Sequence, residues 1–183
     1  MVGNSINEGC CSCNSGCCNG SNEKEKLSNK KTITIDFLYL DLNVCTRCQG
    51  ADANLDAALA EVARVLELTG VEVIVNKINV NSEQLAIAHK FVSSPTIRVN
   101  GRDIQLEVKE SLCESCGDLC GEDVDCRVWV YQGKEYTLPP RGMIVEAILK
   151  VVYGGTDANP QPETEQPYVM PENLKHFYAA MRS

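Results

Sequence analysis

Apolar residues repeat along the chain with two spacings, and these spacings divide it into strands and helices. Strict alternation and β-branched runs predict strands, whereas apolar positions three or four residues apart predict helices. Residues 31–40 alternate and then become wholly apolar, and residues 51–69 carry the helical spacing up to Gly70, a typical helix stop. The predicted elements are strands at 31–40, 71–80, 96–99, 102–106, 127–131 and 135–138 and helices at 51–69, 82–89, 143–152 and 171–181.

The two ends of the chain have a different composition from this patterned middle. Residues 1–31 are mostly Gly, Ser, Asn, Lys and Cys, which predicts a disordered Cys-rich tail unless a metal orders it. Residues 32–154 form the predicted domain, in which residues 106–126 are a Cys-rich insert. Residues 155–183 are predicted to be a linker and a short helix that docks on its own domain or on a partner.

Composition and charge exclude several classes of function. The 183 residues are 44% hydrophobic and 23% charged, which is ordinary for a globular domain. The net charge of −8 does not favour binding to a polyanion, so nucleic acid is not an expected partner. No apolar run approaches membrane-spanning length and no secretory signal begins the chain, so we expect a cytoplasmic protein with no membrane partner.

The number of cysteines changes this ordinary picture. In a reducing compartment, eleven cysteines indicate metal binding or catalysis rather than a disulfide framework, and an odd number also argues against purely structural bridges. The cysteines fall into a tail group, a central pair and an insert group. The groups are Cys10, Cys11, Cys13, Cys17 and Cys18; Cys45 and Cys48; and Cys113, Cys116, Cys120 and Cys126.

The central pair, Cys45-Thr46-Arg47-Cys48, lies between a predicted strand and a predicted helix. A helix N-terminus favours the thiolate, and Arg47 adds a fixed positive charge. We therefore predict Cys45 as an exposed nucleophile and Cys48, on the same side of the helix, as the resolving thiol. Two alternatives are that both cysteines are buried small hydrophobes, or that they hold a soft metal ion.

A second motif, Ser94-Pro95-Thr96, opens the strand 96–99, which turns at Asn100-Gly101 into the next strand. Together with the Cys-x-x-Cys pair and the order β-α-β-α-β-β-insert-hairpin-α, it resembles the thioredoxin-like superfamily over residues 31–152. The insert resembles that of an uncharacterised thioredoxin-like branch from anaerobes. The closing residues 171–178 resemble the C-terminal tails of small redox and metalloid-resistance proteins.

The resemblance implies an α/β thioredoxin-like fold, a central mixed sheet flanked by helices, with the Cys-rich insert before the last hairpin and helix. It also implies that Pro95 is cis and presents substrate backbone beside Cys45. Dithiol exchange with a protein reductase or a thiol substrate would then require no cofactor. Thr46-Arg47 replaces the family's Gly-Pro, and Tyr39 stands where thioredoxins carry a buried acid, so the redox potential and thiol pKa are not carried over.

The insert has the ligand count of a zinc site. Cys113, Cys116, Cys120 and Cys126 supply the four thiolates of a tetrahedral Cys₄ centre for zinc or another soft metal, although the spacing is compressed. Four thiolates also serve iron–sulfur clusters. The alternatives are disulfides, Cys113–Cys116 or Cys120–Cys126, and inert thiols.

The tail cysteines are dense enough to capture thiophilic ions without a folded scaffold. In the sharper hypothesis, Cys10, Cys11, Cys13, Cys17 and Cys18 collect Hg(II), As(III) or Cu(I) and pass it to the central pair. In the other interpretation, the tail is a low-complexity segment whose cysteines do little.

Together the patterns predict an intracellular thiol–disulfide oxidoreductase whose surplus cysteines bind soft metal or metalloid ions. The alternative is a non-enzymatic, thiol-rich binding or resistance protein for mercury, arsenic, copper or zinc. A third interpretation is an enzyme that cleaves or reduces organometallic or metalloid substrates, for which Asp41 is the one evident proton donor. The oxidoreductase and the binding protein differ in what Cys48→Ser should do. In an oxidoreductase this variant should trap mixed disulfides with partner proteins.

Overall fold

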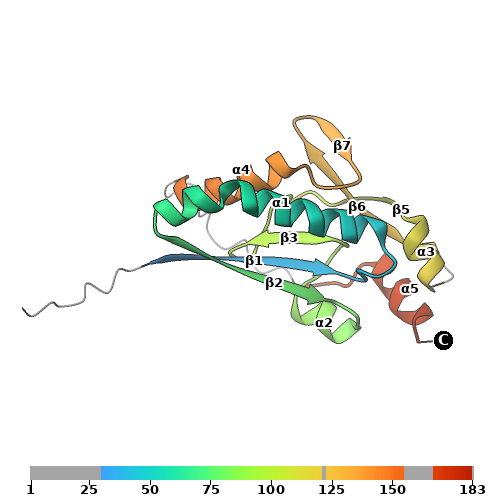
Figure 1. Ribbon diagram of the computed structural model, residues 1–183. Helices are drawn as coiled ribbons and strands as arrows, with labels where there is room; N and C mark the ends of the chain where they lie inside the picture. The colour runs from blue at the N-terminus through green and yellow to red at the C-terminus, as the bar shows by residue number, and fades with distance from the viewer. Residues whose placement is uncertain (1–29, 121–122, 155–166, 183) are drawn as a thin grey trace, which may run out of the picture.

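The computed structural model describes residues 30–120, 123–154 and 167–182 (Figure 1). Residues 1–29 of the predicted tail, with its five cysteines, and most of the predicted linker lie outside these ranges. The side chain of Cys120 also lies outside the described part. The predictions made for these residues therefore stay predictions.

A mixed sheet of four strands forms the centre of the fold. Its order is β2-β1-β3-β4, with β1 parallel to β2 and antiparallel to β3. In β1, Ile33, Ile35 and Phe37 are buried on one face and Leu38 on the other, which explains why its sequence alternates and then becomes continuously apolar. The strands are β1 Lys31–Tyr39, β2 Val71–Asn79, β3 Thr96–Val99 and β4 Arg102–Asp103.

Two helices, α1 Thr46–Leu68 and α4 Arg141–Tyr153, cover one face of this sheet (Figure 1). Their apolar stripes and that face of β1 form the larger core cluster. Helix α1 begins five residues before the predicted start, because Cys45 is its N-cap and accepts a hydrogen bond from the backbone N–H of Cys48. It ends before Gly70, whose positive φ of 70° suits a residue without a side chain.

The other face is covered at one end by α2 Glu83–Ala88 and α5 Glu172–Ala180 (Figure 1). The predicted C-terminal helix therefore docks on its own domain. Its Tyr178 hydroxyl donates to the carbonyl oxygen of Val80 at 2.8 Å. Its Asn173 side chain pairs with both backbone groups of Asp125, at 3.0 and 2.8 Å.

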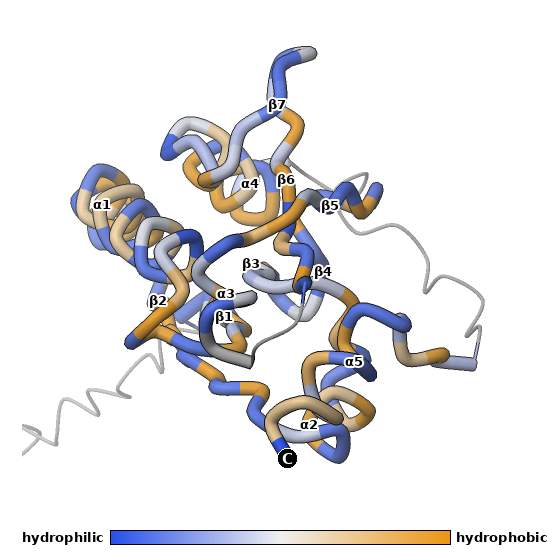
Figure 2. Tube along the Cα trace, turned by 90° about the vertical axis from the view of Figure 1, so that its right-hand side faces the viewer, coloured by the Kyte–Doolittle hydropathy of each residue, from blue (hydrophilic) through white to orange (hydrophobic). Residues whose placement is uncertain are grey.

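The insert forms structure that the apolar pattern did not predict. Strand β5 Lys109–Leu112 and helix α3 Glu114–Cys120 precede the hairpin of β6 Asp125–Tyr131 and β7 Lys134–Tyr136, and the three strands make a second sheet, β5-β6-β7. The predicted turn at Gln132-Gly133 is confirmed by the positive φ of both residues. Figure 2 views this end of the molecule, with α3 lying between α1 and α5.

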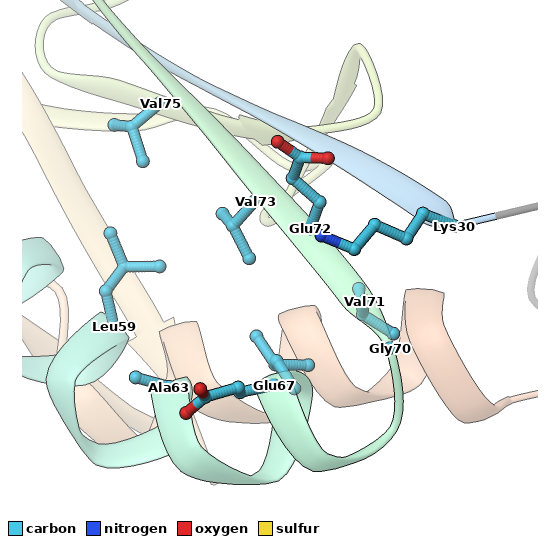
Figure 3. Close-up of a pocket in the computed structure, with 10 residues that line it drawn as sticks. Lys30, Leu59, Ala63, Glu67, Gly70, Val71, Glu72, Val73 and Val75 are labelled. Carbon is cyan, nitrogen blue, oxygen red and sulfur yellow. The ribbon is translucent and has the colours of Figure 1, made fainter. Parts of the chain in front are cut away.

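A groove of about 420 Å³ lies between α1 and the exposed edge strand β2 (Figure 3). Its walls are apolar side chains such as Leu59 and Val73, and Lys30, Glu67 and Glu72 also line it. Cys45 is at the opposite end of α1, a helix of 23 residues and so about 34 Å long. Among the helices of the described ranges, none has the length and apolar character needed to cross a membrane.

Candidate metal centre

The β1–α1 junction places Cys45 at the N-terminus of α1, as the motif predicted. The Asp41 carboxylate shapes the loop before it by accepting hydrogen bonds from the backbone N–H groups of Asn43 and Val44, at 2.7 and 2.6 Å. The Cys45 sulfur accepts from the N–H of Cys48 at 3.3 Å. The prediction that Cys45 is exposed is wrong, since it is 0% exposed. The insert covers it.

The insert supplies three more thiols to the same place. Cys113 precedes α3, Cys116 lies in its first turn, and Cys126 comes from β6. The N–H groups of Cys116 and Gly117 both donate to the carbonyl oxygen of Cys113 at 3.0 Å, a tight turn that brings the sulfurs of its Cys-x-x-Cys together. The sulfurs of Cys116 and Cys126 are 3.3 Å apart.

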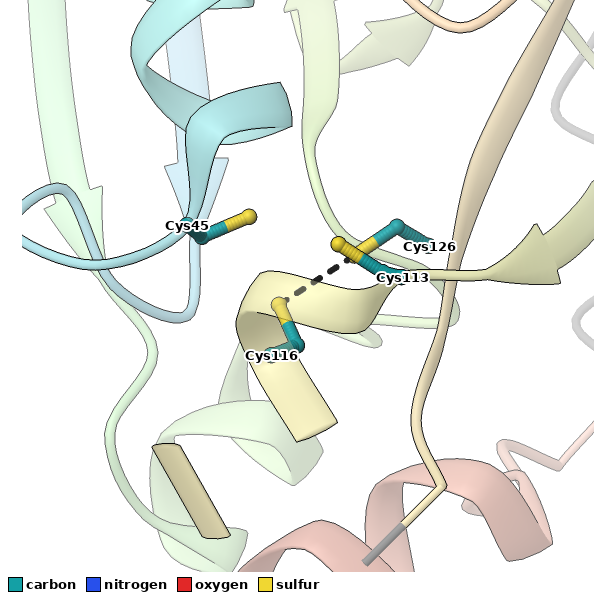
Figure 4. Close-up of side chains that lie close together, drawn as sticks. All are labelled: Cys45, Cys113, Cys116 and Cys126. Carbon is teal, nitrogen blue, oxygen red and sulfur yellow. Dashed lines mark hydrogen bonds between the residues drawn. The ribbon is translucent and has the colours of Figure 1, made fainter. Parts of the chain in front are cut away.

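These cysteines and Cys45 form one cluster. The sulfur atoms of Cys45, Cys113, Cys116 and Cys126 all lie within 4.8 Å of one another, and all four residues are buried. Figure 4 shows the side chain of Cys45 reaching from α1 towards the insert sulfurs. A tetrahedral ion with Zn–S bonds of about 2.3 Å needs sulfurs about 3.8 Å apart, so a single ion fits after small movements. A cubane iron–sulfur cluster is larger and would require the sulfurs to spread.

A set of hydrogen bonds holds the insert against the start of α1. The guanidinium of Arg47 donates to the carbonyl oxygens of Leu112 at 2.7 Å and of Ser111 and Cys126 at 3.2 Å, and to the Ser111 hydroxyl at 2.9 Å. The hydroxyl of Ser115 accepts from the N–H of Thr46 at 3.2 Å. The charge of Arg47 is thus directed at insert carbonyls, and Arg47 joins the two segments that carry the four cysteines.

The clustered thiols shift one another's protonation. Hydrogen bonds from Cys113 and then from the other cluster thiols hold the pKa of Cys45 far below its usual range. Hydrogen bonds from Cys116 and Cys126 lower the pKa of Cys113 to about 6. The partners that donate these bonds, Cys116 and Cys126, have raised pKa values. Since thiolates are the metal ligands, the lowered pKa values prepare two of the four for binding.

Cys48 is buried next to Cys45 but is not a member of the cluster. Its pKa is raised, first by the hydrogen bond with Cys45 and then by burial. Its sulfur contacts the hydroxyl of Ser94 at 3.4 Å, and that hydroxyl accepts from the N–H of Leu40 at 3.2 Å. The five cysteines with described side chains form no disulfide with one another.

The Ser94–Pro95 peptide bond is cis, as the resemblance implied. The carbonyl oxygen of Ser94 accepts from the N–H of Arg127 at 2.7 Å. The backbone acceptor beside Pro95 is therefore already hydrogen-bonded to strand β6 of this chain. The same strand carries Cys126 to Cys45.

The sequence predicted two separate sites, one at the central pair and one at the insert cysteines. The structure brings Cys45 together with three of the four insert cysteines, and it does not describe the side chain of the fourth, Cys120. No spacing rule links Cys45 to a cysteine 68 or more positions away, because only the packing of the insert on α1 brings them together. A surplus of cysteines is the one sequence signal that pointed in this direction.

The fold and the cluster define an α/β domain with a buried four-cysteine centre. The chain belongs to the family described as domain of unknown function (DUF2703), whose model matches residues 33–148. The matched range includes the Cys-x-x-Cys pair and the whole insert. Neither the comparison with curated proteins nor the comparison with solved structures gives a match.

Proposed function

We propose that this protein binds one zinc or other soft metal ion through Cys45, Cys113, Cys116 and Cys126. The observation that carries the proposal is the approach of four buried sulfurs to within 4.8 Å, from segments far apart in the sequence. An all-sulfur set selects zinc and softer ions such as Cu(I), Hg(II) or As(III) over hard cations. Four protein ligands leave no open position, which is typical of a structural or storage site rather than a catalytic one.

The scaffold that holds this ion is, we propose, thioredoxin-like. The strand order β2-β1-β3-β4, the parallel β1–β2 pair, the cis Ser94–Pro95 bond and the Cys-x-x-Cys pair at the start of α1 support this assignment. In this interpretation, Cys45 of the scaffold's Cys-x-x-Cys motif serves as a metal ligand. Reduced thiols are required for binding, so we expect the protein to work in the cytoplasm.

Thiol–disulfide exchange is the second candidate function. The contact between Cys45 and Cys48 at a helix N-terminus, with a cis proline nearby, supports it. The complete burial of Cys45 favours metal binding instead, because a substrate protein could reach its sulfur only after the insert moved away. Exchange would also require the reductase or thiol partner predicted from the sequence.

Native mass spectrometry of the full chain, purified without oxygen, tests the proposal. In the parent protein for these experiments, the five tail cysteines are replaced by serine, so that the tail cannot bind the ion. We expect one bound ion and five thiols protected from alkylation, namely the four ligands and the buried Cys48. Cys45→Ser should bind the ion more weakly and lose it to a competing chelator, whereas its neighbour Cys48→Ser should retain it. A metal-free protein in which every thiol is alkylated without unfolding would contradict the proposal.

The same pair of variants tests the second candidate. An oxidoreductase needs Cys48 to resolve mixed disulfides, so Cys48→Ser should accumulate adducts with partner proteins in the cell. Adducts that form through Cys45 while zinc binding is absent would favour exchange over metal binding. A Cys48→Ser protein that binds its ion and forms no adduct would exclude exchange as the main activity.

A further inference from the structure

Cys45 belongs to two groups of thiols at once. Its sulfur lies within 4.8 Å of those of Cys113, Cys116 and Cys126. It also accepts a hydrogen bond from the N–H of Cys48 at 3.3 Å, and the two residues have the spacing of a Cys-x-x-Cys pair. A sulfur in a disulfide no longer serves as a thiolate ligand. The two roles of Cys45 therefore exclude each other.

We propose that oxidation of Cys45 and Cys48 to a disulfide releases the metal ion, so that the site is a redox-controlled metal store. This inference rests on the proposed metal site. A disulfide between Cys45 and another cluster sulfur would remove two ligands at once, whereas a disulfide with Cys48 removes Cys45 alone. Cys48 is buried against Cys45 and, among the cysteines with described side chains, is the one that lies outside the cluster.

The oxidant that fits the site is a small peroxide, because the cluster is buried. The Cys45 thiolate attacks one oxygen of hydrogen peroxide, so that an S–O bond forms, the O–O bond breaks, and a sulfenic acid and one hydroxide ion result. The Cys48 sulfur then attacks the sulfenic sulfur, the S–S bond forms, and the hydroxyl leaves as water with the Cys48 proton. In total, one thiolate and one thiol are oxidised while hydrogen peroxide is reduced to water and hydroxide.

Loss of Cys45 leaves three thiolates, all from the insert. The insert would also lose its link to α1 through the ion, leaving the contacts of Arg47 and Ser115 to hold it. Zinc then dissociates more readily, because it has lost one of the ligands of a closed tetrahedral site. Reduction of the disulfide by a dithiol would restore Cys45 and the site.

The test uses the zinc-loaded full chain with serine at the tail cysteines. Zinc release is followed with a chromogenic indicator during addition of hydrogen peroxide, and disulfides are mapped in the digested protein. We expect one zinc released per Cys45–Cys48 disulfide formed, and rebinding after reduction. Peroxide is preferred to glutathione disulfide as the oxidant, because reduction of glutathione disulfide releases glutathione, whose thiol is itself a zinc ligand.

Two variants, Cys48→Ser and Cys48→Ala, should bind zinc but release it much more slowly than the parent protein, because a sulfenate at Cys45 keeps a donor atom for the ion whereas a disulfide does not. Release from both variants at the parental rate, or a first disulfide at Cys116–Cys126, would overturn the redox proposal. A parent protein that binds no zinc at the loading step would instead overturn the proposed metal site.

Discussion

The contacts of Arg47 make a sharp prediction, because this one side chain joins the helix that carries Cys45 to the insert that carries the other ligands. Replacing it with Met removes four hydrogen bonds of 2.7–3.2 Å to Ser111, Leu112 and Cys126 while keeping much of the apolar stem. Since three of the acceptors are backbone carbonyls, no other side chain needs to change. The perturbation is therefore confined to the junction.

The size of the effect follows from the number and exposure of these bonds. A hydrogen bond to a charged group contributes about 1.5–3 kcal/mol when buried. Arg47 is half-buried and its bond to Leu112 is exposed, so we expect a total loss of about 2–3 kcal/mol in unfolding free energy. If the whole loss reaches the metal site, affinity falls by about 30- to 150-fold.

Urea denaturation of the metal-free, reduced protein gives the first quantity, and competition against a chelator of known affinity gives the second. Arg64→Met, which changes an exposed arginine of the same helix, is the matched control. Arg47→Lys keeps the charge and should recover only part of both losses, because lysine lacks the planar set of donors. Equal stability and equal metal affinity for Arg47→Met and Arg64→Met would show that the contacts of Arg47 do not hold the insert against α1.

Three further predictions concern the surroundings of the cluster. Asn173→Ala removes both bonds to the backbone of Asp125 and should lower the unfolding free energy by about 1–2 kcal/mol in a thermal melt; an unchanged melt would contradict it. The lowered pKa of Cys113, about 6, predicts that the metal-free, reduced protein gains stability as pH rises from about 6 towards 9, where the unfolded thiol ionises. The lowered pKa of Cys45 contributes to the same rise, so Cys113→Ser should reduce it without abolishing it, and equal urea midpoints across that range would argue against the prediction. Asp103→Asn leaves the buried Arg127 without its ion pair and should cost about 3 kcal/mol; a cost below about 0.5 kcal/mol would show that the pair is not needed.

The part of the fold with strong apolar patterns could be predicted from the sequence. The alternation in β1 and β2 and the helical spacing in α1 reflect burial that each element achieves against the same core, so local sequence carries the information. The short turns at Asn100-Gly101 and Gln132-Gly133 could also be predicted, because such turns need positive φ, which Gly and Asn adopt easily, and both turns have it in the structure. Only element boundaries differed, most clearly at the start of α1, which Cys45 caps.

The structure of the insert could not be predicted from the spacing of apolar residues. Strand β5 has exposed or half-buried residues along its length, so its sequence shows no apolar alternation. The ordering of the insert comes from contacts with distant partners, both polar ones with Arg47 and Asn173 and the burial of Val124 in the core cluster that contains Leu174 and Phe177. Such contacts leave no periodic signal in the sequence.

The site shows the same division between local and distant information. The motif correctly indicated that Cys45 lies at a helix N-terminus, since this depends on the adjacent strand and helix. Its exposure was predicted wrongly, because burial of Cys45 depends on an insert whose first cysteine is 68 positions away. The metal-binding alternative for the central pair was partly supported: Cys45 joins the cluster, but Cys48 does not.

The most direct test of the four-cysteine site is zinc K-edge X-ray absorption of the zinc-loaded chain with serine at the tail cysteines. A site formed by Cys45, Cys113, Cys116 and Cys126 predicts four sulfur ligands at about 2.3 Å. It predicts three sulfurs and one lighter ligand in Cys45→Ser, and four sulfurs in both Cys48→Ser and Cys120→Ser. Four sulfurs retained in Cys45→Ser, with one lost in Cys120→Ser, would show that Cys45 is not a ligand and place the site wholly within the insert.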